Sequence, residues 1–278
     1  MSTWIRESIP RLFPQSSKSS KYDVKFIADY SPRRKLSFAE VEQAIRNETG
    51  QVDEFNCVPV RPFNTVEAGF ALRQLACESP YPDNTLFYVN VAPRRDDTSA
   101  RSNNEGEDLV FLELENGVPV VSTCSGYTLS FVKDKIAEAR SLDIPSYGSQ
   151  FRSRDIFPKA VADLIDRKEE FLEDKVNLDI PEPPEEAIGY IDGFGNIKTT
   201  IRQSEVDFNN GDQLNLELDG ENYSLAFSDG IFHVDEGELV FAPGSSGGDN
   251  PFMEVVLRGG SAEEKLGEPD PGDDLKIS

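Results

Sequence analysis

Apolar and polar positions in the first half of the chain follow two alternating patterns. Short apolar runs, typical of strands, occupy 23–28, 55–60, 86–92, 109–115 and 118–123. Apolar residues at helical spacing follow over 38–45, 66–75, 131–139 and 156–171. The run LFYVNVA at 86–92 is apolar nearly throughout, which predicts a strand buried on both faces. The alternation predicts an α/β domain with a largely parallel sheet over residues 22–180.

Two helix starts can be predicted from their capping residues. Ser37 is a candidate N-cap, and Glu40, three positions on, would complete a capping box. After the turn at 61–64, Thr65 is the predicted cap of the second helix.

A proline- and acid-rich linker, 181–187, separates this domain from a second half of different character. Short β-runs dominate there, at 188–191, 197–201, 213–218, 222–227, 231–234, 238–242 and 252–257. Glycine- and asparagine-containing turns separate them, which predicts a small antiparallel β-barrel or sandwich over 188–278. Residues 1–21 are predicted to be a flexible N-terminal arm, with docking onto a partner as the alternative.

The charge balance excludes one class of partner. The chain carries 51 acidic and 28 basic residues, a formal net charge of −23. Phosphate backbones and anionic membranes need basic patches, so we expect no nucleic-acid or membrane partner. Acid spread along the whole chain fits a protein that works in high salt, where screening removes the self-repulsion. An ordinary acidic cytosolic protein is the alternative.

Cysteine and histidine usage narrows the chemistry further. Cys57, Cys77 and Cys124 are far apart and odd in number, so they predict neither a disulfide framework nor a zinc site. His233 is the single histidine, so a histidine-based metal cluster is excluded and no metal is expected. A Ser-His-Asp triad could use only His233, which has no obvious partner nearby in sequence. No apolar run is long enough to span a membrane, and the N-terminus lacks the apolar core of a signal peptide; we expect a cytoplasmic protein.

The stretch GYIDGFGNIKTTI, residues 189–201, is the strongest candidate for chemistry in the second half. Strand-like residues flank a glycine corner that holds Asp192, Phe194 and Asn196. Asp and Asn in such corners are commonly turn formers. The functional alternative is a planar polar ligand stacked on Phe194 and hydrogen-bonded by Asn196, with a cationic group near Asp192.

Two further positions in the first half invite ligands. Asp29 ends the first predicted strand, and ligands of open α/β sheets bind at the carboxyl ends of strands. The polar cluster 150–155 precedes a helix, where free N–H groups favour anions. A capped helix start with salt-bridged arginines is the alternative for that cluster.

Together these segments resemble the S-adenosylmethionine (SAM) hydroxide adenosyltransferase family, which is related to the fluorinase and chlorinase. IDGFGNIKTTI, 191–201, is similar to the family's I-D-x-F-G-N-L-x-T-N-I, and FRSRDIF, 151–157, to F-H-G-R-D-I-F. Asp29 matches the Asp of T-D-F-G, and the segment 253–278 resembles the family's C-terminal ending. The resemblance covers the chain from about Tyr22 onward and implies an α/β domain followed by a β-barrel, assembled into homotrimers with SAM between neighbouring subunits.

The resemblance also implies roles for single residues. Asp29 would bind the ribose hydroxyls, and Phe63 would pack on the ligand. Phe151, which begins the motif that contains Arg152, is a further substrate-binding candidate. Ser37 and Asp192 would hold the methionine amine, and Ser246 would lie near its carboxylate. Phe194 and Asn196 would recognise adenine, helped by backbone groups around Gly259. SAM would be the substrate, and no cofactor is implied.

The family's hydrolases orient water with an Asp, an Arg and a His, and this chain departs from that set. Ala92 stands at the Asp position and Arg152 at the His position, and Arg101 is the candidate for the arginine. Ser153 replaces a glycine and matches the halide-binding position of the halogenases. The resemblance therefore predicts SAM hydrolysis, with Arg152, Ser153 and Arg101 as catalytic candidates; a SAM- or adenosine-binding protein without turnover and a halide-dependent enzyme are the alternatives.

Overall fold

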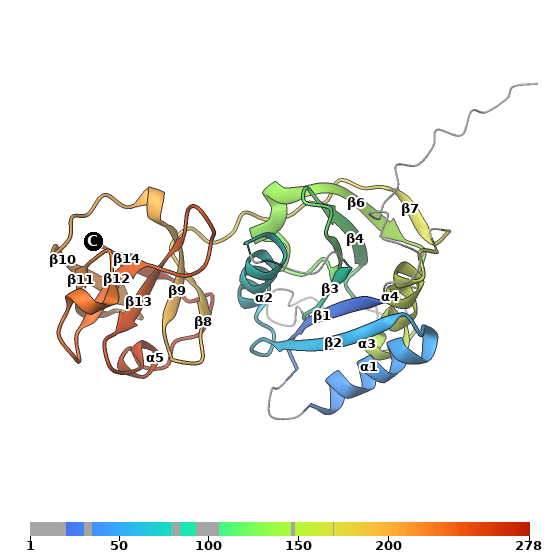
Figure 1. The fold of residues 1–278 in the computed structure, drawn as a ribbon, viewed down its shortest axis with the longest axis horizontal. Coiled ribbons are helices and arrows are strands. Elements are labelled where there is room, and N and C mark those ends of the chain that lie inside the picture. The colour runs from blue at the N-terminus through green and yellow to red at the C-terminus, as the bar shows by residue number, and fades with distance from the viewer. Residues whose placement is uncertain are drawn as a thin grey trace, which may run out of the picture.

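The structure is a computed structural model, and it describes residues 21–30, 35–78, 80, 84–92, 106–145, 148–168 and 170–278. All of the predicted N-terminal arm except Lys21 lies outside these residues, as does most of the polar segment 93–108. The chain forms two domains joined by an extended segment (Figure 1).

A seven-stranded mixed sheet forms the first domain, in the order β2-β1-β3-β5-β4-β6-β7. Its strands are β1 (Tyr22–Ala28), β2 (Val52–Pro59), β3 (Thr85–Asn90), β4 (Leu109–Leu114), β5 (Pro119–Thr123), β6 (Ile136–Leu142) and β7 (Leu172–Lys175). Strands β2, β1, β3 and β5 pair in parallel, which confirms the predicted parallel core. Strands β4, β6 and β7 extend it by antiparallel pairing.

Helices cover both faces of this sheet. They are α1 (Leu36–Glu48), α2 (Thr65–Arg73), α3 (Arg152–Asp155) and α4 (Phe157–Ile165), with a π-helical turn Gln74–Glu78 and a 3₁₀ helix Ser130–Lys135. Successive β1 residues point to opposite faces: Phe26 packs in the cluster with α1 and α4, whereas Ile27 packs in the cluster with α2. All six residues of β3 are buried, as its continuous apolar run predicts.

Three local predictions are wrong. Helix α1 begins at Leu36 after Lys35, so Ser37 lies inside the helix and caps nothing. Helix α2 is capped by Asn64, one residue before the predicted Thr65. The predicted helix at 131–139 is a short 3₁₀ helix followed by β6, because Ile136–Leu142 finds hydrogen-bonding partners in both β4 and β7. Pairing with two strands outweighs the helical spacing of its apolar residues.

We expect Asn64→Ala to lower the free energy of unfolding by about 1 kcal/mol or more, the usual value for an N-cap. The Asn64 side-chain oxygen accepts the Glu67 amide at 2.8 Å, and its nitrogen donates to the Pro271 carbonyl at 2.6 Å. Asn64→Asp keeps the cap but loses the donor to Pro271, so urea unfolding of the two variants separates the two contributions. If Asn64→Ala and Asn64→Asp lower the free energy of unfolding equally, the whole effect comes from the contact with Pro271.

The strand order creates a topological switch point in the parallel half of the sheet. Strand β1 lies between β2 and β3, and the connections from β1 to β2 and from β2 to β3 pass over opposite faces. Strand β2 lies on one side of β1 and β3 on the other, so the strand order reverses at β1. Ligands of open α/β sheets bind in the crevice outside the carboxyl ends of the strands at such a point. Asp29, directly after β1, lies at this crevice, as predicted.

The second domain is a seven-stranded sheet, in the order β14-β10-β11-β12-β13-β9-β8, that nearly closes into a barrel. Its strands are β8 (Ile188–Ile191), β9 (Ile197–Arg202), β10 (Gln213–Leu218), β11 (Glu221–Phe227), β12 (Leu239–Pro243), β13 (Phe252–Leu257) and β14 (Leu275–Ile277). Its short helices are α5 (Ala262–Lys265) and two 3₁₀ turns, Gln203–Glu205 and Ile231–His233. Backbone hydrogen bonds between residues 186–188 and 272–275 bring the two sheet edges together.

The barrel agrees with the sequence prediction with three differences. The β11–β12 pair is parallel, whereas the other pairs are antiparallel. The predicted strand 231–234 is instead a 3₁₀ turn, and β14 was not predicted. Alternation along β10, with Leu214, Leu216 and Leu218 facing the core, explains why most strands could be recognised.

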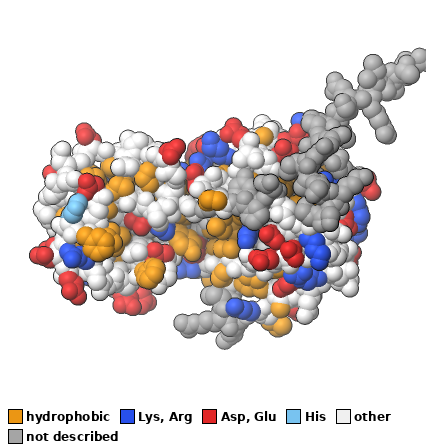
Figure 2. Space-filling view, in the orientation of Figure 1, with side chains coloured by type: hydrophobic (Ala, Val, Ile, Leu, Met, Phe, Trp, Pro, Cys, Tyr) orange, Lys and Arg blue, Asp and Glu red, His pale blue; other side chains and the backbone are white. Residues whose placement is uncertain are grey.

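The visible surface carries acidic side chains over both domains, and apolar side chains gather where the domains meet (Figure 2). Of the helices in the described ranges, none is long and apolar enough to cross a membrane.

Candidate functional site

A pocket of about 440 Å³ opens at the switch point of the first sheet. Its volume lies in the range of small-molecule sites. Five of the predicted site residues line it together: Asp29, Ser37, Phe151, Arg152 and Ser153. Three separate segments, following β1, at the start of α1 and at α3, supply these side chains, and the strand order brings them to one place.

Asp29 is held in place by backbone amides. Its Oδ2 atom accepts the amide of Phe63 at 3.0 Å and that of Ala92 at 3.3 Å. The three residues follow β1, β2 and β3 respectively, so a single carboxylate ties together the ends of three neighbouring strands. Phe63 adopts a left-handed backbone conformation, φ 64°, in doing so. Ala92 contributes only its backbone amide to this contact.

Tyr30 and Asn90 are pocket residues that the sequence analysis missed. The Tyr30 hydroxyl donates to Ser153 Oγ at 2.8 Å and accepts from the Asn90 amide at 3.3 Å. Burial raises the pKa of Tyr30; the hydrogen bond with Ser153 opposes this shift, and the charges of Asp29 and Glu40 add to it, so the hydroxyl stays protonated near neutral pH. Tyr30 follows Asp29 after the first predicted strand, and Asn90 is a polar residue inside the apolar predicted strand 86–92; these positions are the signal that could have found them.

Arg152 is buried, with an exposed fraction of 7%. Its guanidinium donates to the carbonyls of Glu107 at 2.7 Å and Pro145 at 3.1 Å, and it lies 4.8 Å from the centre of the Phe157 ring. Its Nε atom has no hydrogen-bond partner among the residues that the structure describes. Burial lowers the pKa of this arginine, with Asp108 and Glu107 opposing. Arg152 is therefore a desolvated cation bonded mainly to main-chain oxygens.

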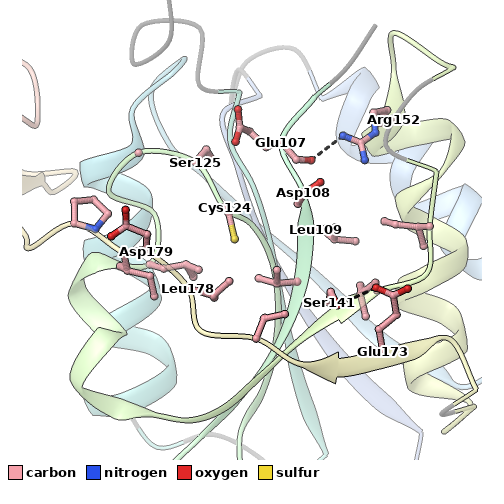
Figure 3. A pocket seen from close by; sticks show the side chains of 18 residues that line it. Glu107, Asp108, Leu109, Cys124, Ser125, Ser141, Arg152, Glu173, Leu178 and Asp179 are labelled. Atoms are coloured by element: carbon pink, nitrogen blue, oxygen red, sulfur yellow. Dashed lines mark hydrogen bonds between the residues drawn. The ribbon is translucent and has the colours of Figure 1, made fainter. Parts of the chain in front are cut away.

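A second cavity, of about 520 Å³, shares Arg152 and Glu107 with the pocket. Figure 3 shows the Arg152 guanidinium bonded to the main chain at Glu107, with the Cys124 thiol below. Strands β4 and β6 and the segment 176–181 form much of its wall, and Leu109, Leu142 and Leu178 make part of it apolar.

We expect Cys124 to resist thiol reagents in the folded protein. Burial raises the pKa of its thiol to about 12, with Asp108 and Glu107 adding to the effect. Roughly one thiol in 10,000 is then ionised at pH 8, and only the thiolate reacts. Cys57 is exposed and should label first. Maleimide labelling with peptide mass spectrometry measures the order; equal rates at Cys57 and Cys124 before unfolding would contradict it.

Asp192, Phe194 and Asn196 form a tight turn between β8 and β9 in the barrel. Asp192 Oδ1 accepts the amides of Phe194 at 2.9 Å and Asn196 at 3.1 Å, and Oδ2 accepts the Asn196 side-chain amide at 3.0 Å. The turn interpretation is thereby confirmed. The Phe194 ring is 82% exposed and stands on the surface of the chain.

The remaining predicted residues are spread around the domain boundary. Phe63 precedes α2, and Gly259 lies in the turn between β13 and α5, with φ 82°. Ser246 is buried beside the far end of α2, where the neighbouring Gly247 amide donates to the Gln74 side chain at 3.1 Å. Together with Asp192, Phe194 and Asn196, none of these lines the switch-point pocket as described. Arg101 lies outside the described residues.

His233 has the neighbours that the sequence did not reveal, Ser228 and Asp229. Ser228 Oγ lies 2.9 Å and Asp229 Oδ1 3.0 Å from the same ring atom, Nδ1. A catalytic triad needs the acid on one imidazole nitrogen and the serine on the other. The cluster is therefore not a triad.

Comparison with known proteins agrees with this architecture. Two crystal structures have similar folds: an uncharacterized conserved protein from Thermotoga maritima, with a TM-score of 0.72 and 21% identity, and a conserved hypothetical protein from Thermus thermophilus, with a TM-score of 0.65 and 19% identity. The matches cover 91% and 92% of this chain and 99% and 100% of those chains. No curated protein matches the chain.

The sequence model of the SAM hydroxide adenosyltransferase C-terminal domain matches residues 186–275, which span the barrel from β8 into β14. This segment contains the Asp192–Asn196 turn as well as Ser246 and Gly259. The resemblance to the SAM hydroxide adenosyltransferase family is thus confirmed for residues 186–275, the C-terminal domain of this chain.

Proposed function

We propose that this protein binds SAM and hydrolyses it to adenosine and L-methionine. The observation that carries the proposal is the match of residues 186–275, with the turn 192–196 inside it, to the C-terminal domain of SAM hydroxide adenosyltransferases. A pocket of suitable size at the switch point of the other domain supports it. The two domains would each supply one part of the ligand site.

The α/β domain would hold the ribose. Asp29 is a carboxylate, the acceptor that a pair of hydroxyls needs, and two backbone amides fix its orientation. Ser37 would contact the methionine amine from the start of α1, and Phe63 and Phe151 would pack on the ligand. Phe151 is 55% exposed, so its ring is available for such contact.

The barrel would hold adenine and the methionine end. Phe194 would stack on adenine, Asn196 and the backbone near Gly259 would hydrogen-bond its edge, and Asp192 would pair with the ammonium group. Ser246 would lie near the carboxylate. We propose that these residues close the site of a neighbouring subunit in a homotrimer. The 82% exposure of Phe194 within one chain leaves its ring free for such a contact.

Hydrolysis of SAM requires the protein mainly to position the attacking water and the substrate. A water oxygen attacks C5′, the C5′–sulfur bond breaks, the electron pair stays on sulfur as the methionine thioether, and the proton leaves to solvent. The sulfonium is already a good leaving group, so the site must align the water and exclude competing orientations. Ser153, held by Tyr30, would orient this water, with Arg152 and Arg101 as the further catalytic candidates.

Arg152 also supports a second candidate function, SAM or adenosine binding without turnover. Where the family's hydrolases have a histidine, this chain has a guanidinium bonded to two main-chain carbonyls. A guanidinium does not exchange protons near neutral pH. Halide transfer is the third possibility, because Arg152 and Ser153 could hold chloride.

Product analysis distinguishes these functions. Purified protein is incubated with SAM in molar KCl and in low-salt buffer, and the products are identified by liquid chromatography with mass spectrometry. Adenosine and methionine above a heat-inactivated control support hydrolysis, and 5′-chloro-5′-deoxyadenosine would indicate halide transfer. Saturable SAM binding in calorimetry without products would establish the binding protein.

A variant pair tests the role of Arg152 directly. If the chain is a binding protein, Ala92→Asp with Arg152→His should create hydrolysis by restoring the family's residues. Ala92→Asp with Arg154→His is the matched control, because Arg154 lies on the same short helix but is paired with Asp155 at the surface. If both double variants hydrolyse SAM, the gain of activity does not depend on the residue at position 152.

A further inference from the structure

Arg61 connects the two domains through its side chain. It belongs to the turn between β2 and α2, and its Nη1 atom donates to the Pro269 carbonyl and to Asp270 Oδ1, both at 2.7 Å, while Nη2 pairs with Glu263. All three acceptors belong to the barrel domain. The neighbouring Asn64 adds a further hydrogen bond across the boundary, to Pro271.

Both ends of this connection lead to residues of the proposed ligand site. On the α/β side, Phe63 follows two positions after Arg61 and donates its amide to Asp29. On the barrel side, the Glu263 amide donates to the Gly195 carbonyl at 2.9 Å, inside the turn 192–196. The turn is packed tightly there, since a Cβ on Gly195 would meet Ser261 Oγ at 2.0 Å. A shift at either end of Arg61 is therefore passed to the site.

Arg61 also gathers three carboxylates at the boundary. Besides Glu263 and Asp270, Glu67 accepts the backbone amide of Arg61 at 2.6 Å, and Glu67 is only 5% exposed. Burial raises the pKa of Glu67; Arg61 opposes the shift, and Asp270 and Glu263 add to it. Removal of the guanidinium would leave like charges facing one another where the two domains touch.

We infer that Arg61 is a positioning residue that fixes the orientation of the barrel relative to the α/β domain, and so aligns the Asp29 pocket with the turn 192–196. The alignment part of this inference rests on the proposed function; the orientation part does not. With ligands between subunits, each chain would contribute its Asp29 pocket to one site of the trimer and its turn 192–196 to another. The angle between the two domains, which Arg61 fixes, then decides whether the three subunits form a closed ring.

The test compares Arg61→Met with Arg61→Lys and with Arg73→Met. Arg73 is the matched control: it also pairs with two carboxylates, Glu78 at 2.7 Å and Asp134 at 2.6 Å, but both belong to the α/β domain. Small-angle X-ray scattering reports the arrangement of the domains, and limited proteolysis of the linker 181–187 reports its exposure. Circular dichroism establishes that each variant is folded.

For Arg61→Met we expect an altered scattering profile, faster cleavage of the linker and a loss of about tenfold or more in kcat/KM for SAM, because small misplacements of a bound substrate have effects of this size. Arg61→Lys should show an intermediate loss, and Arg73→Met should leave the scattering profile and linker cleavage unchanged. The triple variant Arg61→Met, Glu263→Gln, Asp270→Asn separates positioning from repulsion. It should regain thermal stability without regaining turnover.

Wild-type scattering and linker cleavage in a folded Arg61→Met protein would overturn the inference, whether or not SAM is turned over. Full recovery of kcat/KM in the triple variant would also overturn it, because charge repulsion alone would then explain the defect. If the wild-type protein does not act on SAM, the scattering and proteolysis results still decide the orientation role, so failure of the proposed function remains distinguishable from failure of this inference.

Discussion

Asp192→Ala is expected to weaken SAM binding by roughly 100-fold, with turnover falling in parallel. The carboxylate accepts three hydrogen bonds that hold the turn, and it would also face the ammonium group of the ligand. A hydrogen bond to a charged group contributes about 1.5–3 kcal/mol, and loss of the turn adds to that effect. Isothermal titration calorimetry with SAM measures the change, with product analysis alongside.

Asp212→Ala is the matched control for this prediction. Asp212 also stabilises a turn of the barrel, by accepting the Asn209 amide at 2.8 Å, but it lies in the turn before β10. The Asp212→Ala variant should bind SAM with the affinity of the wild type. Asp192→Asn refines the test, since the amide keeps the turn-forming acceptor and loses the charge; wild-type affinity in Asp192→Asn would refute an ammonium contact at this carboxylate.

Lys198→Met is expected to produce the largest loss of stability, about 3–5 kcal/mol, because it leaves a buried carboxylate without its counter-charge. Lys198 and Glu254 form an ion pair on neighbouring strands β9 and β13, and each side chain is only 9% exposed. Glu254 also accepts the Ser245 amide at 2.9 Å, directly before Ser246. Urea denaturation followed by circular dichroism measures the change.

Two comparisons make this result interpretable. Lys133→Met removes the lysine of an exposed pair with Glu182 and should cost at most about 1 kcal/mol. The double variant Lys198→Met, Glu254→Leu replaces both charges and should recover most of the lost stability. A double variant as unstable as Lys198→Met alone would show that packing, and not the unpaired charge, causes the loss.

The contrast between local and long-range information explains how far the fold could be predicted. Most strands of both domains were recognisable because their burial follows the run or alternation of their own residues. The helix predicted at 131–139 failed because its outcome depends on β4 and β7, which lie elsewhere in the chain. Ser37 with Glu40 has the sequence of a capping box, yet the helix begins before it.

The candidate site divides in the same way. Asp29 could be predicted because an acid after a buried strand has a defined place in an open sheet. The contact of Tyr30 with Ser153 joins positions 123 residues apart, and no local pattern encodes it. Likewise, the sequence identifies Arg152 by its motif but does not reveal that the carbonyls of Glu107 and Pro145 surround it.

The closure of the barrel brings the two ends of this domain together, which affects how the domain can be rearranged in engineering or in evolution. Residues 186–188, which enter the barrel from the linker, hydrogen-bond to residues 272–275, which complete it. The first and last residues of the barrel sheet thus lie next to each other. Domains whose ends are adjacent tolerate circular permutation and insertion into other chains. Contacts across the domain boundary hold the barrel to its present neighbour, among them the hydrogen bonds of Arg61 and the apolar cluster of Val66, Phe70, Phe131 and Phe252.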